Sequence, residues 1–378
     1  MRQLNLTYLV STLGRTGPTN QLFNLVSRLD RGVFHPSIVT ISPEPADSLA
    51  REFQGLGVRV RSLKLSRIEG ILRGPRRLRS LLKQYPADVV HSQGIRPDFL
   101  NSTLRYPTTR IATQRNDPFV DYPMLYGQVG GLIMARLHVT ILRKLPKVVT
   151  CSHTIELSNQ CHQLPSTTIQ NGIDTRNKYV VSSKEKGAKR EALRLPESVL
   201  LFIWAAPFIS RKNPAAVIKA FGDAQNSKKK HLCVLGDGPL LNKTKRSAAQ
   251  YDNISFKGKV DNVDDYLMAA DCFISTSLSE GLPNSVIEAL SWGLPTILSD
   301  IPAHREIHQI EKRSGDLFSL DNPHALTELI ESFEISGTTA HFARSIVVNH
   351  LNADAMAGHY QTLYHSLTNN RSSFVPVS

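Results

Sequence analysis

Two glutamates, Glu280 and Glu288, are the residues whose type and spacing point most directly to chemistry. They follow an apolar run at 272–276, and Gly281 and Pro283 lie between them. This order is typical of a strand, a turn and a helix with Pro283 in its first turn. Open α/β sheets bind ligands at the carboxyl ends of their strands, where helix-start amides attract anions. Each carboxylate can also accept hydrogen bonds from a pair of hydroxyls. The segment therefore indicates a site for an anionic or hydroxyl-rich ligand.

Short β-branched runs alternate with segments of helical spacing and must position these glutamates. The runs in the first half are 4–10, 36–41, 58–63, 87–91, 110–113, 147–151 and 167–170, and those in the second half are 199–205, 231–235, 254–257, 272–276, 295–299 and 316–320. Apolar strands that alternate with helices favour parallel sheets covered on both faces. The sequence therefore predicts an α/β fold with two Rossmann-like, doubly wound domains.

The length of 378 residues also indicates two domains. We expect an N-terminal domain at 1–175, a polar linker at 176–197 and a C-terminal domain at 198–350. A last helix and a frayed tail follow at 351–378. No apolar run approaches the roughly 18 residues that cross a bilayer, and the first residues lack a secretory pattern. These features predict a cytoplasmic protein.

The positive charge is concentrated in the first half. Residues 1–175 hold 22 lysines and arginines against 11 aspartates and glutamates, whereas the remaining residues hold 23 against 21. The densest stretch, 59–83, has nine basic residues against the single Glu69, and it includes Arg73, Arg76, Arg77 and Arg79. Such a run suits an anionic membrane surface, although a solvated face without a partner is an open alternative. It contains no aromatic residue between Phe53 and Tyr85, so nucleic acid is not expected as a partner.

The segment 279–290 resembles the paired-glutamate motif of the retaining glycosyltransferases of family 4, which have the GT-B fold. The match continues through 291–300, Ser-Trp-Gly-Leu-Pro-Thr-Ile-Leu-Ser-Asp, and weaker matches run in family order from Tyr8 to about Tyr364. The resemblance implies two Rossmann-like domains that face each other across a cleft. It also implies a C-terminal helix that returns to the N-terminal domain, which faces the acceptor.

The resemblance also implies roles for individual residues. It places Glu280, Lys212 and Arg115 in catalysis, and Lys212 would stabilise the charge of a leaving diphosphate. Glu288 would bind the ribose hydroxyls of the donor. The other implied donor-binding residues are Gly17, Arg211, Gly281, Leu282, Asn284, Ser285, Lys259 and Val260.

Three segments depart from the family pattern. Ala206-Pro207-Phe208 replaces the usual Gly-Arg-Leu, so we expect Arg211 to supply the missing charge. Gln114-Arg115-Asn116 stands where many members have a histidine, and Arg115 would stabilise charge in its place. The first loop carries 16–19, Thr-Gly-Pro-Thr, where the family has Gly-Gly-Ala-Glu.

The resemblance implies a retaining hexosyltransferase that uses a nucleotide sugar as co-substrate. No two aspartates are spaced Asp-x-Asp, so neither a metal nor another cofactor is expected. The acceptor would be a lipid-linked or oligosaccharide glycan in bacterial-type synthesis of lipopolysaccharide or capsule, at the cytoplasmic face of the membrane. A GT-B nucleotide-sugar epimerase and an inactive sugar-nucleotide-binding partner are open alternatives. The sequence does not determine the oligomeric state.

Overall fold

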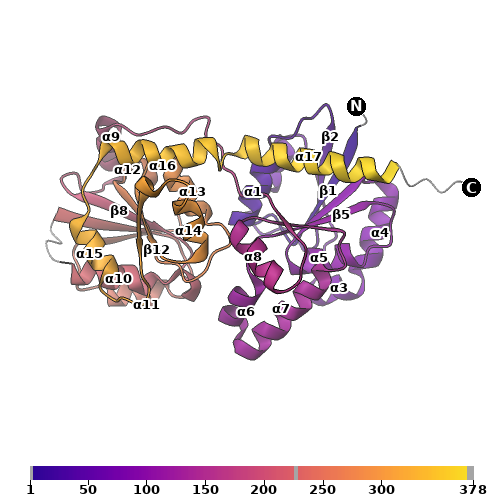
Figure 1. Ribbon diagram of the computed structural model, residues 1–378, viewed down its shortest axis with the longest axis horizontal. Coiled ribbons are helices and arrows are strands. Elements are labelled where there is room, and N and C mark those ends of the chain that lie inside the picture. Colours follow the sequence, from indigo (N-terminus) through magenta and orange to yellow (C-terminus); the bar gives the residue numbers. More distant parts are fainter. Residues whose placement is uncertain (1–2, 225–228, 373–378) are drawn as a thin grey trace, which may run out of the picture. The chain divides into compact units, whose positions relative to one another are not determined.

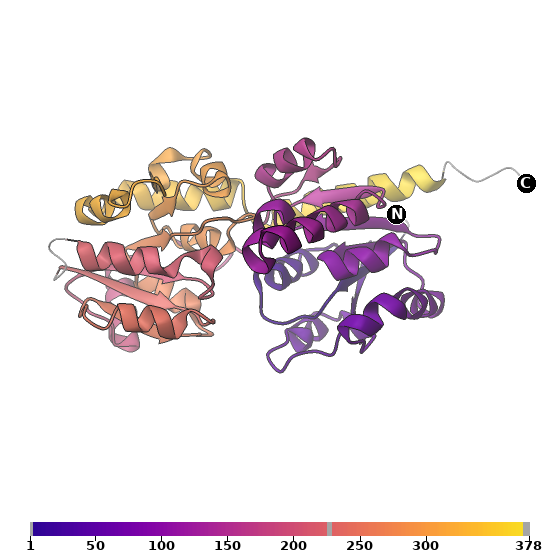
Figure 2. The same cartoon turned by 90° about the horizontal axis from the view of Figure 1, so that it is seen from below.

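The computed structural model describes residues 3–224 and 229–372, and the chain divides into two compact units. Unit 1 comprises residues 1–172 and 353–378, and unit 2 comprises residues 173–352. In each unit, helices cover both faces of a central sheet (Figures 1 and 2). Two α/β units with parallel sheets confirm the predicted fold class. The predicted tail lies, from residue 373 onward, outside the described residues.

The sheet of unit 1 has the order β3-β2-β1-β4-β5-β6-β7, and its paired strands are parallel. The strands are β1 (Leu4–Val10), β2 (Phe34–Thr40), β3 (Arg59–Ser62), β4 (Val89–Gln93), β5 (Thr109–Gln114), β6 (Lys147–Thr150) and β7 (Thr167–Thr168). All seven overlap the apolar runs that predicted them. The strand order reverses on either side of β1, as it does in a doubly wound sheet.

Alternate residues of β1 enter two cores on opposite faces of this sheet. Tyr8 packs among residues of α1 and α17, whereas Leu9 packs among residues of α4 and α5. The helices of unit 1 are α1 (Gly17–Val26), α2 (Ala50–Gly55), α3 (Arg67–Leu72), α4 (Gly74–Gln84), α5 (Ile95–Ser102), α6 (Pro118–Tyr126), α7 (Gln128–Leu142), α8 (His153–Cys161) and α17 (Ala353–Ser372). Buried residues of α17 lie in the core of unit 1, so the C-terminal helix returns to this unit as predicted.

A buried polar group ties α17 to the sheet of unit 1. The Tyr364 hydroxyl lies 3.1 Å from that of Tyr8 and 2.8 Å from His91 Nδ1, and His91 Nε2 lies 2.7 Å from the Thr113 hydroxyl. Burial and the charge of Arg115 lower the pKa of His91 to about 3. His91 is therefore a neutral, hydrogen-bonded side chain of the core.

The sheet of unit 2 has the order β10-β9-β8-β11-β12-β13 and is also parallel. The strands are β8 (Leu200–Ala205), β9 (Lys230–Leu235), β10 (Ile254–Gly258), β11 (Cys272–Ser275), β12 (Thr296–Ser299) and β13 (Gly315–Phe318). All six overlap the predicted runs. The order reverses between β8 and β11, and the carboxyl ends of these neighbouring strands form the switch point where such sheets bind ligands.

The helices of unit 2 correct one domain prediction. They are α9 (Ser183–Leu193), the 3-10 turn η1 (Ser210–Lys212), α10 (Pro214–Asp223), α11 (Leu241–Ser247), α12 (Val263–Ala269), α13 (Asn284–Ser291), α14 (Pro302–His308), the 3-10 turn η3 (Lys312–Ser314), α15 (Ala325–Ser332) and α16 (Gly337–Asn349). The predicted linker at 176–197 is wrong, because α9 lies within it and contacts α12. A capping box at Ser182 and Glu185 starts α9. Arg190 fixes it through a 2.6 Å ion pair with the buried Asp271.

Candidate active site

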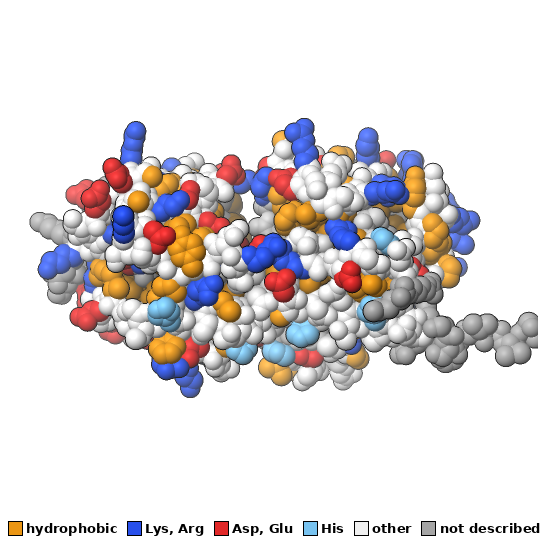
Figure 3. All heavy atoms as spheres, turned by 90° about the horizontal axis from the view of Figure 1, so that it is seen from above, with side chains coloured by type: hydrophobic (Ala, Val, Ile, Leu, Met, Phe, Trp, Pro, Cys, Tyr) orange, Lys and Arg blue, Asp and Glu red, His pale blue; other side chains and the backbone are white. Residues whose placement is uncertain are grey.

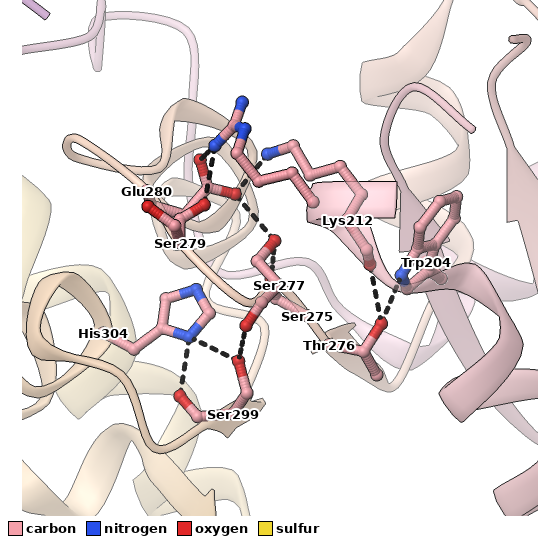
Figure 4. Close-up of polar contacts among 10 residues, drawn as sticks. Trp204, Lys212, Ser275, Thr276, Ser277, Ser279, Glu280, Ser299 and His304 are labelled. Atoms are coloured by element: carbon pink, nitrogen blue, oxygen red, sulfur yellow. Dashed lines mark hydrogen bonds and ion pairs between the residues drawn. The ribbon is translucent and has the colours of Figure 1, made fainter. Parts of the chain in front are cut away.

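The candidate site lies at the switch point of unit 2, where segments that follow β8 and β11 are joined by hydrogen bonds. The Leu278 amide donates to the Arg211 carbonyl at 2.8 Å. The Thr276 hydroxyl lies 3.0 Å from the Lys212 carbonyl and accepts a hydrogen bond from Trp204 Nε1 at 3.1 Å (Figure 4). Since these contacts fix η1 against the loop after β11, the side chains that both segments carry have defined positions.

Glu280 lies at the centre of this site and pairs with two cations. Its Oε1 contacts Lys212 Nζ, and its Oε2 accepts a hydrogen bond from Arg211 at 2.8 Å (Figure 4). The Ser277 hydroxyl donates to Oε1 at 2.7 Å, and Arg211 also donates to the Ser279 carbonyl at 2.6 Å. Glu280 and Lys212 are both buried, so the pair is shielded from solvent.

The charge state of Glu280 follows from these contacts. Burial has the largest single effect and raises the pKa of this carboxyl. The charges of Lys212 and Arg211 and the hydrogen bonds from Lys212 and Ser277 together outweigh burial and lower the pKa to about 2. Glu280 is therefore ionised at neutral pH, and two cations are held at the carboxyl ends of β8 and β11.

A buried histidine lies beside this group. His304 Nδ1 is 2.7 Å from the Ser299 carbonyl, so the nitrogen that bears the proton is Nδ1. Nε2 then carries the lone pair, and it has no hydrogen-bond partner in the described part of the chain. Burial lowers the pKa of His304 to about 4, although the charge of Glu280 opposes this shift. The ring is neutral at physiological pH, with its lone pair available as an acceptor.

Glu288 lies in a separate polar group on α13. Burial has the largest effect and raises the pKa of the Glu288 carboxyl. The charge of Lys178 lowers this pKa and the charge of Asp264 raises it, so the pKa is about 7. Lys178 is itself paired with Asp264 at 2.5 Å, and Asp264 accepts a hydrogen bond from Trp292 Nε1 at 2.7 Å. Lys178 also lies 4.8 Å from the centre of the Trp292 ring. The charge of Lys178 is thus shared, which leaves Glu288 partly protonated near neutrality.

The loop that connects the glutamates is buried and leads directly into α13. Gly281 and Leu282 are buried, whereas Asn284 and Ser285 are half-buried at the start of the helix. Pro283 occupies the N-cap position, so the prediction that it lies in the first helical turn is wrong by one residue. The aligned peptide dipoles of α13 make its first turn, which follows Glu280 in the sequence, the positive end of the helix.

The remaining predicted residues lie elsewhere. Lys259 and Val260 follow β10 in unit 2, and Lys259 is exposed. Gly17 opens α1 in unit 1. Arg115 follows β5 in unit 1, where it donates to Gln93 at 3.1 Å and to Asn171 at 2.5 Å. Arg73, Arg76, Arg77 and Arg79 are exposed at the start of α4 and along it. Among the residues predicted for the site, the structure brings Arg211, Lys212 and Glu280 into direct contact.

Several residues of the two polar groups were not predicted. Ser277 and Ser279 belong to a run of small polar residues before Glu280, and that run is the one sequence signal that could have indicated them. His304 is a lone histidine that no pattern distinguishes. Lys178 fell in the supposed linker, and its pairing with Asp264 joins residues 86 positions apart. Among the described residues, no group of three or more His, Cys, Asp or Glu side chains is placed to hold a metal ion.

Comparison with known proteins gives this arrangement a family. Residues 16–169 match the glycosyl transferase 4-like domain, and residues 185–344 match the glycosyl transferases group 1 domain. The chain is 25% identical over 378 residues to an O-antigen biosynthesis glycosyltransferase of Escherichia coli, WclY, a match that covers 96% of this chain and 99% of that protein.

Two further similarities cover a part of the sequence and the fold. Over 140 residues, 35% of this chain and 36% of the relative, the chain is 29% identical to an Escherichia coli UDP-Gal:alpha-D-GlcNAc-diphosphoundecaprenol alpha-1,3-galactosyltransferase. Its fold matches sucrose-phosphate synthase from Thermosynechococcus elongatus with a TM-score of 0.82 at 18% identity, over 98% of this chain and 100% of that structure. The first domain match lies within unit 1 and the second within unit 2. The chain therefore belongs to the glycosyltransferases of the GT-B fold, and its matches are consistent with family 4.

Proposed function

We propose that this glycosyltransferase moves a sugar from a nucleotide diphosphate to a lipid-linked glycan, with retention of anomeric configuration and without a metal. The pathway is the synthesis of a bacterial-type surface polysaccharide. Two relatives support this proposal, because one is named for O-antigen biosynthesis and the other for transfer from UDP-galactose to a diphosphoundecaprenol-linked sugar.

The observation that carries the proposal is the contact of Arg211 and Lys212 with Glu280 at the start of α13. A diphosphate leaves slowly unless its developing charge is stabilised, and preorganised cations in a site shielded from water do this most effectively. Arg211 and Lys212 bind the same carboxylate. This shared contact supports the proposal that Arg211 replaces the family arginine, at whose position this chain has Pro207. The helix-start amides after Pro283 add to the same positive end.

Glu280 holds both cations in place while no donor is bound. A donor diphosphate binds the same two side chains, so it competes with Glu280 for their charge. Glu280 then turns one oxygen toward the donor sugar, where it accepts hydrogen bonds from sugar hydroxyls. Glu288 binds the ribose hydroxyls. The acceptor oxygen bonds to the anomeric carbon on the face that the diphosphate leaves, the bond from that carbon to the diphosphate oxygen breaks, and the departing phosphate takes the acceptor's proton. Arg115 stabilises charge on the acceptor side.

The acceptor's lipid carrier implies a place at the cytoplasmic face of an anionic membrane. Arg76, Arg77 and Arg79 are exposed along α4, and Arg73 at its start pairs with Glu69 at 3.4 Å. Each basic residue near an anionic surface contributes about 1 kcal/mol, and salt screens the attraction. This basic face holds the enzyme where the lipid-linked acceptor lies.

The test is a transfer assay. A panel of nucleotide sugars is incubated with the protein and a detergent-dispersed polyprenyl-diphosphate-linked sugar, and both released nucleoside diphosphate and extended glycan are measured. One donor should give both products, with a linkage that retains the donor's anomeric configuration by NMR. An inverted linkage would overturn retention. Conversion of a nucleotide sugar without acceptor would identify an epimerase, and the absence of donor binding and turnover throughout the panel would overturn the proposal.

A further inference from the structure

A cavity of about 460 Å³ lies in unit 1 near the amino ends of β1, β2 and β3. Arg115, which we place on the acceptor side, follows the opposite, carboxyl end of β5. Because a strand of seven residues such as β1 is about 20 Å long, the cavity and Arg115 lie at different edges of the sheet. The volume is in the usual range for small-molecule sites.

The strand register gathers polar side chains on one face of the sheet at this cavity. Asn5 pairs with His35, and Ser37 pairs with Arg59. Since alternate residues of a strand share a face, Arg61 lies on the same face as these four. Nearer the carboxyl ends this face is apolar, and α4 packs on it. Helix α4 ends at the edge of the cavity, so the polar side chains beyond it remain accessible.

Three arginines supply most of the charge of the cavity. Arg59 and Arg61 belong to β3, and Arg31 precedes β2. None of the described residues that line the cavity is an aspartate or a glutamate. Arginines elsewhere in unit 1 have acidic partners, as Arg15 has in Glu52 at 2.5 Å. Like charges around one cavity repel each other, and an anion bound between them would relieve that repulsion.

The corresponding edge of unit 2 is neutralised internally. A cavity of about 910 Å³ lies near the amino ends of β8 and β9, and its described lining residues include four basic and four acidic ones. Lys186 and Arg190 lie 3.2 and 2.6 Å from Asp271. Basic and acidic side chains are likewise interspersed on the face of the molecule that Figure 3 shows. The excess of arginine therefore distinguishes the cavity of unit 1.

Two of the three guanidinium groups are already oriented. Arg61 lies over the Tyr85 ring, with its central guanidinium carbon 3.6 Å from the ring centre. Arg31 donates to the Leu56 carbonyl at 3.1 Å. A guanidinium has five N–H donors, so these contacts leave most of them for a ligand. An oriented, planar guanidinium also loses little entropy when it forms two parallel hydrogen bonds with an oxyanion.

The lining of the cavity indicates the class of ligand. A carboxylate carries one negative charge, whereas a phosphate monoester carries about 1.5 to 2 at neutral pH and has three acceptor oxygens. Three arginines therefore match a phosphate better than a carboxylate. The side chains of Asn5, Ser37 and Gln84 also line the cavity, and each can exchange hydrogen bonds with hydroxyls. These groups together fit a small hydroxylated molecule that bears a phosphate.

We propose that this cavity is a second ligand site, which binds the phosphate group of a soluble phosphorylated sugar through Arg31, Arg59 and Arg61. The ligand is held there and not converted, because the cavity shares no residue with the candidate active site. The inference goes beyond the proposed function and does not depend on it. No helix in the described part of the chain is both long and apolar enough to span a membrane, and the inference concerns a ligand free in solution.

The experiment is calorimetry with glucose 1-phosphate as the probe. The variant Arg59→Ala/Arg61→Ala tests the cavity. The matched control, Arg76→Ala/Arg79→Ala, removes the same charge from exposed positions of α4 outside the cavity. The cavity variant should lose about tenfold or more in affinity, the order of one charge-assisted hydrogen bond, and the control should bind as the parent does.

Two comparison ligands separate the parts of the probe. Glucuronate has a similar ring but a single charge, and inorganic phosphate has the charge without the hydroxylated ring. Both should bind more weakly to the parent than glucose 1-phosphate does, because each lacks one set of the proposed contacts. If either bound as tightly as glucose 1-phosphate, the assignment to a phosphorylated sugar would be wrong.

A local readout distinguishes the cavity from the cations of the candidate active site, which could also attract a phosphate. The variant Tyr85→Trp keeps an aromatic ring beneath Arg61 and places an indole at the cavity, whereas Trp204 and Trp292 are buried in unit 2. Its emission should change over the concentrations at which calorimetry detects binding.

Three results would overturn the inference: no binding of glucose 1-phosphate, equal affinity of the parent and the cavity variant, or binding heat without a change in this emission. The last result would assign the phosphate to another site. Intact binding in the cavity together with a failure of sugar transfer would count against the proposed function alone.

Discussion

Two glutamates of one motif, eight positions apart, have opposite environments. Glu280 lies between Lys212, Arg211 and the Ser277 hydroxyl, and its pKa falls to about 2. Glu288 lies beside Lys178 and Asp264, and its pKa rises to about 7. Burial raises the pKa of both carboxyls, so the difference comes from the charges and hydrogen bonds around them. Lys212 and Arg211 both pair with Glu280 and stabilise its charge, whereas Lys178 is already paired with Asp264.

In the proposed function the two residues have different roles. Glu280 is ionised and holds two cations where the diphosphate would bind. Glu288 has a pKa near 7, so its capacity to accept hydrogen bonds from ribose hydroxyls would depend on pH. The motif alone shows neither property, because both depend on residues that lie far away in the sequence. The following variants test this division from the larger effect to the smaller.

The largest effect is expected for Lys212→Ala. The change removes a buried cation from the leaving diphosphate and leaves Glu280 with one cation, so transfer should fall by a factor of about 10² or more. Initial rates at saturating acceptor measure the effect. Lys219→Ala is the matched control, because Lys219 is exposed on the neighbouring α10 and pairs with Asp223 at 3.7 Å. Equal activity in the two variants would show that Lys212 has no part in catalysis.

Glu280→Gln separates the two proposed duties of this residue. The amide has the same shape but no charge, so it no longer competes with a diphosphate for Lys212 and Arg211. Nucleoside diphosphate should bind more tightly, by about tenfold, the order of one charge-assisted hydrogen bond. Sugar transfer should nevertheless fall, since the contacts to the sugar weaken.

Calorimetry with nucleoside diphosphate and the transfer assay check this prediction together. Glu311→Gln, on a half-buried glutamate paired with the exposed Arg313, is the control. Weaker binding of the bare nucleotide by Glu280→Gln would show that Glu280 supports the diphosphate rather than competing with it.

Local sequence was sufficient for the fold but not for the environment of the site. The strands were predictable because buried parallel strands are short apolar runs, and a contiguous motif singles out Glu280 and Glu288 as candidates. The Glu280 contacts with Arg211 and Lys212 required that β8 and β11 be neighbours, which follows from the strand order of the whole sheet. Helix α9 was missed because its sequence is largely polar, so no apolar pattern marks the side that packs against α12. The residues around Glu288 come from three separate segments, and no local pattern connects them.

The pH dependence of donor binding tests Glu288. With a pKa near 7, its ionised fraction rises from about a tenth at pH 6 to about nine tenths at pH 8. The ionised carboxylate accepts hydrogen bonds from the ribose hydroxyls better than the protonated one does. Nucleotide affinity should therefore increase several-fold as the pH rises through this pKa. Dividing the affinity of the parent by that of Glu288→Gln at each pH cancels the ionisation of the diphosphate itself. A ratio that stays constant from pH 6 to pH 8 would contradict the role of Glu288.

The smallest effect is expected from a chelator. In the proposed mechanism, Arg211, Lys212 and the first amides of α13 carry the charge of the leaving diphosphate, so the divalent cation that many nucleotide-dependent enzymes require has no charge left to neutralise. Transfer rates measured with EDTA should equal those measured with added Mg²⁺ or Mn²⁺. Lys212→Ala sharpens this test, because a site that lacks one cation has charge for a metal to replace. Mg²⁺ should therefore restore part of the activity of the variant while it leaves the parent unchanged. If the parent lost its activity in EDTA and regained it with Mg²⁺, a metal ion would stabilise the leaving diphosphate instead of Arg211 and Lys212. The contacts of these two residues with Glu280 would then be structural.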